Sequence, residues 1–198
     1  IFGGNGADRL TVDSAITVSV LFDGGAGNDT FTGGAGNDTF IGNGGDDEFH
    51  GGGGNDIADY SADAVVNHTF SLDNVANDGT DADTNGIGEE GDDVQTDIED
   101  VVGGSGNDLL VASDDPNFIE GLWGKAGDDV LRGLGGQDTF RGGGAADVIE
   151  GGSGIDRAFY SGATRQAWTQ SWPPKPCVVR AIDARCGTFT VPENRARP

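Results

Sequence analysis

A nine-residue pattern, GGxGxDxUx with U apolar, occurs ten times in this chain. It is clearest at residues 24–59, which read GGAGNDTFT, GGAGNDTFI, GNGGDDEFH and GGGGNDIAD. One nonapeptide cannot bury its single apolar residue alone, so the copies must stack on one another into a parallel β-helix. The aspartate and the glycine-rich backbone of each turn suit calcium, which prefers oxygen ligands. The repeat therefore predicts a fold and a ligand together.

Charge divides the chain into two parts. Residues 1–162 contain 32 acidic and 5 basic residues, a net charge of −27, whereas residues 163–198 contain 2 acidic and 6 basic residues. The acidic part repels nucleic acid and anionic membranes, and it opposes its own compaction without counterions. We expect the calcium-free form to be unfolded or nearly so, because low hydrophobicity with high net charge is typical of disorder. No apolar run approaches the roughly 18 residues of a membrane span.

The ten repeats form two arrays. Within each array the repeat aspartates are nine residues apart, except where a twelve-residue stretch (12–23 or 112–123) is inserted. The first repeat begins in register at the start of the chain, so we expect a larger parent polypeptide. The expected fold class is all-β: tandem right-handed parallel β-rolls, a β-helix of nonapeptide repeats, with a β connector and a non-repeat tail. The expected domains are a first β-roll at 1–61, a cap or connector with an acidic loop at 62–102, a second β-roll at 103–162, and the tail at 163–198.

Two nonapeptides make one coil of 18 residues, so turns 18 residues apart lie one above the other. The apolar U residues then point into a narrow core: Leu10, Phe31, Phe40, Phe49, Ala58, Leu110, Leu131, Phe140, Ile149 and Ala158. We interpret Tyr60 and Tyr160, which follow the last repeats, as lids. In the connector, Val65–Leu72 and Val94–Val102 are candidate strands.

Calcium is expected between stacked turns, where one aspartate reaches the ion from each turn. The spacing pairs Asp8 with Asp29, Asp29 with Asp47, Asp38 with Asp56, Asp108 with Asp129, Asp129 with Asp147, and Asp138 with Asp156. About six ions follow from this stacking. Asp56 and Asp156 are expected to end their stacks, whereas Asp29 and Asp129 each serve two sites.

Residues 3–59 and 103–159 resemble the RTX, or haemolysin-type, calcium-binding repeats of secreted bacterial proteins. The resemblance implies a β-roll that passes unfolded through a type I secretion channel and folds outside the cell, where calcium is abundant. It also implies that turn carbonyls ligate calcium beside the aspartates. The matching positions are Gly25, Gly27, Gly34, Gly36, Gly45, Gly52, Gly54, Gly104, Gly106, Gly127, Gly136, Gly152 and Gly154.

Four repeats depart from the pattern. Asn43, Lys125 and Leu134 replace the second glycine, and Ala145 replaces the fourth. Asparagine tolerates positive φ, but the other three do so less readily. Both turns of the expected site of Asp129 with Asp147 carry such a departure, Lys125 in one and Ala145 in the other. The alternative interpretation of the repeats, a disordered glycine and aspartate linker, does not explain a nine-residue register with an apolar residue at the eighth position.

The connector contains a separate candidate site. Its acidic loop at 81–92 has the oxygen spacing of an EF-hand-type calcium loop, with glycine at the sixth position but aspartate at the twelfth. It resembles the loops of dockerin or thrombospondin type 3 repeats more, and a solvated acidic loop is an equal alternative. If the loop binds calcium, it holds a seventh ion through Asp81, Asp83, Asn85, Glu89 and Asp92.

No catalytic motif is present: the chain has no GxSxG and no HExxH. His50 and His68 are expected at the surface. In the tail, residues 168–198 resemble the start of secreted α/β-hydrolases of the tripeptidyl aminopeptidase type, without a catalytic residue. Cys177 and Cys186 are the only cysteines, and a disulfide between them is expected outside the reducing cytosol.

The predicted function is that of a secreted, extracellular calcium-binding β-roll that folds when it binds calcium. No nucleic-acid partner and no enzymatic activity of this segment are expected. Two alternatives remain for the parent protein. The segment is an accessory region of a hydrolase that lies beyond Pro198, or a spacer or binding module of an adhesin.

Overall fold

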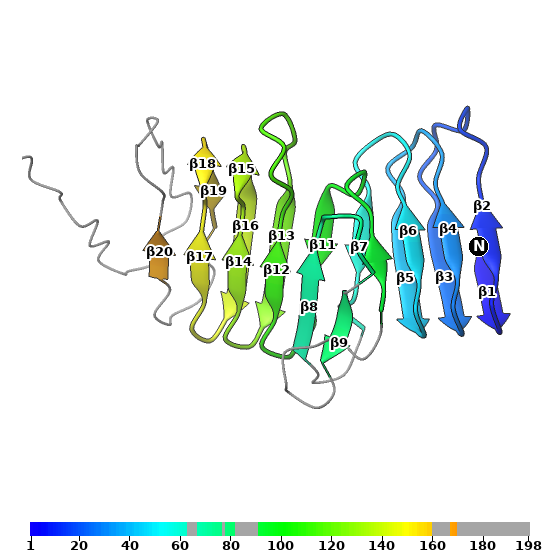
Figure 1. Ribbon diagram of the computed structural model, residues 1–198, viewed down its shortest axis with the longest axis horizontal. Helices are drawn as coiled ribbons and strands as arrows, with labels where there is room; N and C mark the ends of the chain where they lie inside the picture. The colour runs from blue at the N-terminus through cyan, green and yellow to red at the C-terminus, as the bar shows by residue number, and fades with distance from the viewer. Residues whose placement is uncertain (63–66, 77, 82–90, 160–166, 170–198) are drawn as a thin grey trace, which may run out of the picture.

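The computed structural model describes residues 1–62, 67–76, 78–81, 91–159 and 167–169. These residues form strands and no helix, so none of them belongs to a helix long and apolar enough to cross a membrane. The strands are stacked in a row along one long axis (Figure 1). Tyr160 and the predicted disulfide of Cys177 with Cys186 lie outside the described residues.

One face of the stack is a single eight-stranded parallel sheet. Its strands in spatial order are β1 (Phe2–Asn5), β3 (Leu21–Ala26), β5 (Thr39–Gly44), β7 (Ile57–Asp59), β11 (Asp100–Val102), β13 (Gly121–Ala126), β16 (Thr139–Gly144) and β19 (Arg157–Ala158). β11 comes from the connector and pairs with β7 on one side and β13 on the other. The sheet therefore continues from the first array into the second.

The other strands form three smaller sheets. Four strands lie in the order β10 (Asp93–Val94), β6 (Glu48–His50), β4 (Thr30–Thr32) and β2 (Arg9–Thr11). Six lie in the order β20 (Ala167–Thr169), β17 (Val148–Glu150), β14 (Val130–Arg132), β12 (Leu109–Val111), β8 (Asn67–Ser71) and β9 (Gly79–Asp81). The third sheet has two strands, β15 (Gly135–Gly136) and β18 (Ser153–Gly154). Only β8 with β9 is antiparallel among these strand pairs. β20 extends the sheet into the segment predicted as tail.

The register follows the repeat. Phe22 pairs with Phe40, and Phe31 with Phe49, so consecutive coils are 18 residues apart. Leu10 pairs with Phe31, because the twelve-residue stretch lengthens that coil by three residues. The predicted all-β fold of stacked parallel strands is confirmed. The candidate strand Val65–Leu72 is found as β8, but the candidate strand Val94–Val102 is two short strands, β10 and β11, which belong to different sheets.

The core is a column of aromatic and aliphatic side chains between the two faces. The Phe22 and Phe40 rings stack with centroids 4.9 Å apart, and those of Phe31 and Phe49 stack at 5.1 Å. Tyr60 is 4 % exposed. The centroid of its ring lies 6.1 Å from that of Phe49 in the first array and 4.2 Å from that of Phe70 in β8. The interpretation of Tyr60 as a lid is wrong, because the connector continues the core beyond it.

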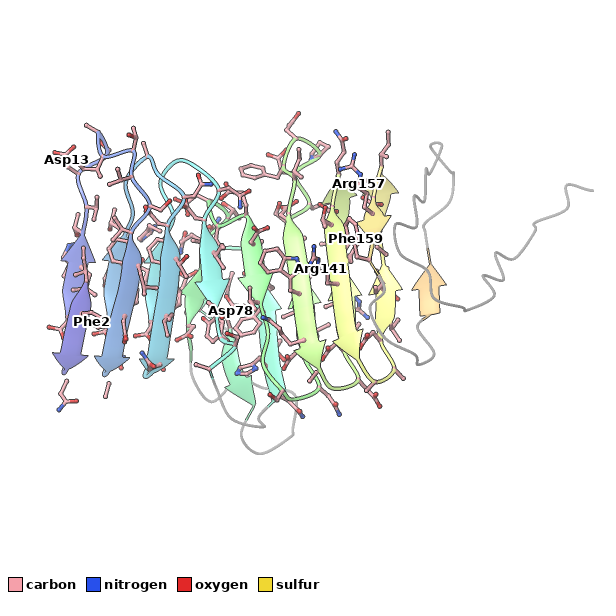
Figure 2. All side chains as sticks on the ribbon, turned by 180° about the vertical axis from the view of Figure 1, so that it is seen from behind. Phe2, Asp13, Asp78, Arg141, Arg157 and Phe159 are labelled. Carbon is pink, nitrogen blue, oxygen red and sulfur yellow. The ribbon has the colours of Figure 1, made fainter. Side chains whose placement is uncertain are left out.

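Asp78 joins the two sheets of the second face (Figure 2). Its Oδ1 accepts the backbone N–H of Ser71, at the end of β8, at 2.5 Å, and its Oδ2 accepts that of Val94 in β10 at 3.0 Å. Burial raises the pKa of this carboxyl to about 7. One connector side chain thus bridges the sheet of the first array and the sheet of the second.

Candidate metal centre

The repeat turns of the first array form two stacks. In one stack the backbone N–H of Asp8 donates to Oδ1 of Asp29 at 2.8 Å, and that of Asp29 donates to Oδ1 of Asp47 at 2.8 Å. In the other stack the N–H of Asp38 donates to Oδ1 of Asp56 at 2.7 Å. Each aspartate therefore lies directly above the one that the spacing pairs with it.

The second array repeats this ladder. The N–H of Asp108 donates to Oδ1 of Asp129 at 2.9 Å, and that of Asp129 to Oδ1 of Asp147 at 3.2 Å. The N–H of Asp138 donates to Oδ1 of Asp156 at 3.1 Å. The structure thus brings together all six predicted pairs of aspartates.

Most of these carboxylates are buried. Asp8 is partly exposed, and the other nine are at most 2 % exposed: Asp29, Asp38, Asp47, Asp56, Asp108, Asp129, Asp138, Asp147 and Asp156. While Oδ1 accepts the hydrogen bond of the ladder, the second oxygen is buried without a hydrogen-bond partner in Asp8, Asp29, Asp56, Asp129, Asp138 and Asp156. A buried carboxylate oxygen without a donor is costly unless a proton or a cation compensates it.

The pKa values reflect this cost. Burial raises the pKa of Asp56 and that of Asp129 to about 7, although each also accepts a backbone N–H that lowers it. Burial, followed by the neighbouring carboxyl of Glu120, raises the pKa of Asp138 to about 9. The turns thus hold carboxylates whose charged form lacks compensation from the protein alone, and a bound cation would supply it.

The first glycine of a repeat leaves open the space that the unpartnered oxygen faces. A Cβ on Gly3 would lie 3.0 Å from Oδ2 of Asp8 and 2.6 Å from the carbonyl oxygen of Gly24, in the next turn of the stack. A carboxylate oxygen of one turn and a carbonyl oxygen of the next therefore converge beside a bare α-carbon. The same arrangement recurs at Gly124 and Gly133. At Gly33 and Gly103 the same two kinds of oxygen converge, but there Oδ2 of Asp38 and of Asp108 also accepts the N–H of Gly34 and of Gly104.

This set of donors fits calcium. Calcium takes six to eight oxygen ligands, from carboxylates, backbone carbonyls and water. Within the described ranges no three side chains of His, Cys, Asp or Glu gather closely enough to hold a metal. The carboxylates alone therefore do not make a site. An ion between two stacked turns would take one carboxylate from each turn, as from Asp8 and Asp29, and the turn carbonyls must supply the rest of the coordination.

The predicted carbonyl ligands occupy the second and fourth positions of the turns. Several point at the glycine one coil further on, namely those of Gly27, Gly34, Gly36, Gly106 and Gly136. The Gly34 carbonyl also accepts the N–H of Gly53 at 2.9 Å, and the Gly104 carbonyl accepts that of Ala126 at 3.3 Å, which leaves each one lone pair. The first-position carbonyls, such as that of Gly24, were missed because the pattern does not say which carbonyls face the next turn.

The four departures from the pattern all adopt positive φ. The values are 72° for Asn43, 81° for Lys125, 55° for Leu134 and 71° for Ala145. The turn therefore keeps its left-handed positions even where a side chain makes them unfavourable, at a cost of roughly 1–2 kcal/mol each for the residues other than asparagine.

Replacing Gly127 with alanine should lower the free energy of unfolding by about 2–5 kcal/mol. Gly127 has a φ of 125°, and a Cβ there would overlap the carbonyl oxygen of Gly106 in the turn below. The matched control is Gly53→Ala, because the nearest heavy atom to a Cβ at Gly53 is 3.8 Å away. Urea unfolding in millimolar calcium measures the free energy of unfolding of both variants. Equal losses of stability would show that the close approach of the turns does not require glycine at position 127.

The ladder continues into the connector, where no repeat occurs. Oδ1 of Asp92 accepts the N–H of Asp47 at 2.8 Å, and Oε2 of Glu99 accepts the N–H of Asp56 at 2.7 Å. A Cβ on Gly51 would meet Oδ2 of Asp56 and the carbonyl oxygen of Asp97, as at the repeat turns. The prediction that Asp56 ends its stack is therefore wrong, because the connector forms a further coil.

The predicted loop site at 81–92 is described only at its ends. Asp83, Asn85 and Glu89 lie outside the described residues, and Asp81 is described only as the last residue of β9. Asp92 is buried, and besides its bond to Asp47 its Oδ2 accepts the Tyr60 hydroxyl at 2.8 Å. Asp92 thus belongs to the turn stack, and calcium binding by the loop stays a prediction.

Both histidines were expected at the surface, and the structure places only His50 there. His50 is partly exposed, and its Nε2 lies 3.1 Å from Glu48. His68 is 1 % exposed, so its expected surface position is wrong. Its backbone N–H donates to Oδ1 of Asp108 at 2.8 Å, and its ring Nδ1 lies 3.1 Å from the same oxygen. His68 therefore stands in the ladder at the point where a repeat aspartate would precede Asp108.

Comparison with known proteins points to the same repeats. The family model of the RTX calcium-binding nonapeptide repeat matches residues 23–58, 102–125 and 123–158. These ranges contain nine of the ten repeat aspartates, all except Asp8. No curated protein matches the chain.

Proposed function

Because residues 23–58 and 102–158 belong to the RTX calcium-binding nonapeptide repeat family, we propose that the stacked turns of this chain hold calcium between successive repeat aspartates. The observation that supports this most is a buried second carboxylate oxygen without a hydrogen-bond donor in Asp8, Asp29, Asp56, Asp129, Asp138 and Asp156. In Asp8, Asp29, Asp56, Asp129 and Asp138 this oxygen faces the bare α-carbon of a glycine. A divalent cation supplies the missing charge.

The proposed ligands are the carboxylates of the six pairs and the carbonyls of the turns. Each pair provides one carboxylate from each of two stacked turns, which gives about six calcium ions. Asp29 and Asp129 each lie between two other aspartates of their stacks. They are therefore assigned to two ions each, whereas Asp8 is assigned to one.

The buried carboxylates are assigned to calcium rather than to acid–base chemistry, because each lies in a turn stack among glycine carbonyls. On this proposal the segment itself is a folding and binding module and not a catalyst. Activity of a parent polypeptide, as a hydrolase or an adhesin, would reside in other domains.

The proposed setting is outside the cell. Residues 1–162 carry a net charge of −27, which opposes compaction until calcium neutralises it. Extracellular calcium modules bind at about 10⁻⁴–10⁻³ M, so they stay empty inside a cell and fill outside it. Type I secretion of an unfolded chain followed by calcium-induced folding fits this order of events.

Neighbouring aspartates of one turn provide the test. Asp129 is buried in the ladder, whereas Asp128 is exposed, and Oδ1 of Asp128 accepts the N–H of Ala146 at 2.8 Å. Asp129→Asn should reduce the number of calcium ions bound in equilibrium dialysis by up to two. Asp128→Asn removes the same charge and should leave the number unchanged. Equal numbers for both variants and the wild type would contradict the proposal.

A further inference from the structure

The two twelve-residue stretches that interrupt the arrays differ at one structurally equivalent position. The N–H of Val20 donates to Oδ1 of Asp38 at 2.8 Å, and the N–H of Glu120 donates to Oδ1 of Asp138 at 3.3 Å. Val20 and Glu120 thus each precede the first repeat aspartate of their turn stack. The first array has an apolar residue there, and the second has an acid.

Glu120 is buried and only half satisfied. The side chain is 1 % exposed. Its Oε1 accepts the hydroxyl of Ser113 and the N–H of the same residue, the latter at 3.3 Å. Its Oε2 is buried without a hydrogen-bond partner, as is Oδ2 of the neighbouring Asp138.

Oxygens from three segments converge beside Gly136. A point at the Cβ position of this glycine lies 2.7 Å from the carbonyl oxygen of Phe118, 3.1 Å from Oδ1 of Asp138 and 3.3 Å from Oε2 of Glu120. The space exists only because Gly136, with a φ of 136°, carries no side chain.

The first array shows what this place looks like without the acid. The Cβ position of Gly36 lies 2.5 Å from the carbonyl oxygen of Val18, but the next atoms are the Val18 carbonyl carbon and the backbone nitrogen of Ser19 at 3.0 Å. The carbonyl is thus common to both arrays, and each array has an aspartate whose Oδ1 accepts the N–H of the equivalent residue. The carboxylate of Glu120 is found only in the second array, because the equivalent residue of the first array is Val20.

Two buried carboxylates in contact cannot both keep their charge without a cation: without one they share a proton in a hydrogen bond, and a bound cation lets both ionise. Asp138 and Glu120 meet in this way, and the backbone groups around them offer one more oxygen, from Phe118. A set of oxygens without nitrogen or sulfur selects a hard cation such as calcium.

We propose that Glu120, Asp138 and the Phe118 carbonyl form an additional calcium site at the head of the second turn stack of the second array, a site that the first array lacks. It rests on the proposed calcium binding of the repeats, but it uses a residue outside every nonapeptide. The second array then holds one more ion than the first.

Exchange of the two equivalent residues tests the site. Calcium is counted by equilibrium dialysis at saturating calcium for the wild-type chain, Glu120→Gln, Val20→Glu and the double variant. Glu120→Gln keeps the size of the side chain and the oxygen that Ser113 holds, so it should bind one ion fewer than the wild type. Val20→Glu should bind one ion more, and the double variant should return to the wild-type number. Far-UV circular dichroism in calcium confirms that each variant has folded.

The outcomes separate this inference from the proposed function. A wild-type chain that binds no calcium would overturn both. A wild-type chain that binds calcium, with an unchanged number in Glu120→Gln, would overturn the additional site alone. If Glu120→Gln fails to fold, an unchanged number in a folded Val20→Glu variant would likewise overturn it, because the oxygen set would then be insufficient.

Discussion

Transfer of the protein from millimolar calcium to a calcium-free buffer should lower its free energy of unfolding by about 8 kcal/mol. If each of the six stacked pairs binds one ion with a Kd of about 100 μM and free calcium is about 1 mM, each ion contributes about 1.4 kcal/mol. That total equals the whole stability of a typical domain, about 5–15 kcal/mol. We therefore expect the calcium-free chain to be largely unfolded at neutral pH.

Urea unfolding over a series of free calcium concentrations measures this dependence. Magnesium at the same concentrations is the control, since it prefers a tight octahedral site and keeps its bound waters. It should restore little of the stability. A free energy of unfolding that does not change between chelator and millimolar calcium would mean that calcium does not stabilise the fold.

Replacing Phe40 with alanine should cost about 3–5 kcal/mol in calcium. The side chain is fully buried, with its ring 4.9 Å from that of Phe22, 6.0 Å from Phe31 and 6.2 Å from Phe49. The Phe40 ring stacks on Phe22 and makes edge contacts with both rings of the second stacked pair, Phe31 and Phe49. Its removal therefore leaves a cavity that the side chains of the narrow core cannot fill.

The control for Phe40→Ala is Phe2→Ala, because Phe2 is 77 % exposed in the first strand. That variant should change the free energy of unfolding by less than about 0.5 kcal/mol. Urea unfolding at a fixed calcium concentration compares the two. A loss below about 1 kcal/mol for Phe40→Ala would contradict the description of a single continuous core.

The repeat predicted the coils and the ladder because residues nine apart in the sequence occupy equivalent positions in the fold. An apolar residue at the eighth position, as in Phe31 and Phe49, fixes the core side of each strand. A separation of 18 residues then fixes which turns stack, as in Asp38 with Asp56. These inferences need only the period of the sequence, and the structure agrees with them.

The connector was less predictable, because no period runs through it. Tyr60 and His68 look like boundary residues when the arrays are taken as separate rolls. In the structure a further coil lies between the arrays, so both side chains are buried, with their ring centroids 5.7 Å apart. Asp92 and Glu99 take the places of repeat aspartates there, and only the contact with the preceding turn reveals it.

Glu120 was missed for a different reason. It lies in a stretch without the nonapeptide pattern, and its sequence neighbourhood gives no sign of a metal ligand. Alignment of the two arrays at an offset of 100 residues places it opposite Val20, and a position that changes from apolar to acidic is the signal that could have found it. Its meaning depends on Phe118 and Asp138 lying around one point, which only the structure gives.

Diffraction from crystals grown in millimolar calcium and measured at a long X-ray wavelength tests the central claim most directly, because anomalous scattering locates calcium without assumptions about ligands. We predict an anomalous peak between the two turns of each stacked pair, with the second carboxylate oxygen of Asp29 and of Asp129 among the nearest atoms. Well-ordered turns without anomalous peaks between these aspartates would contradict the account.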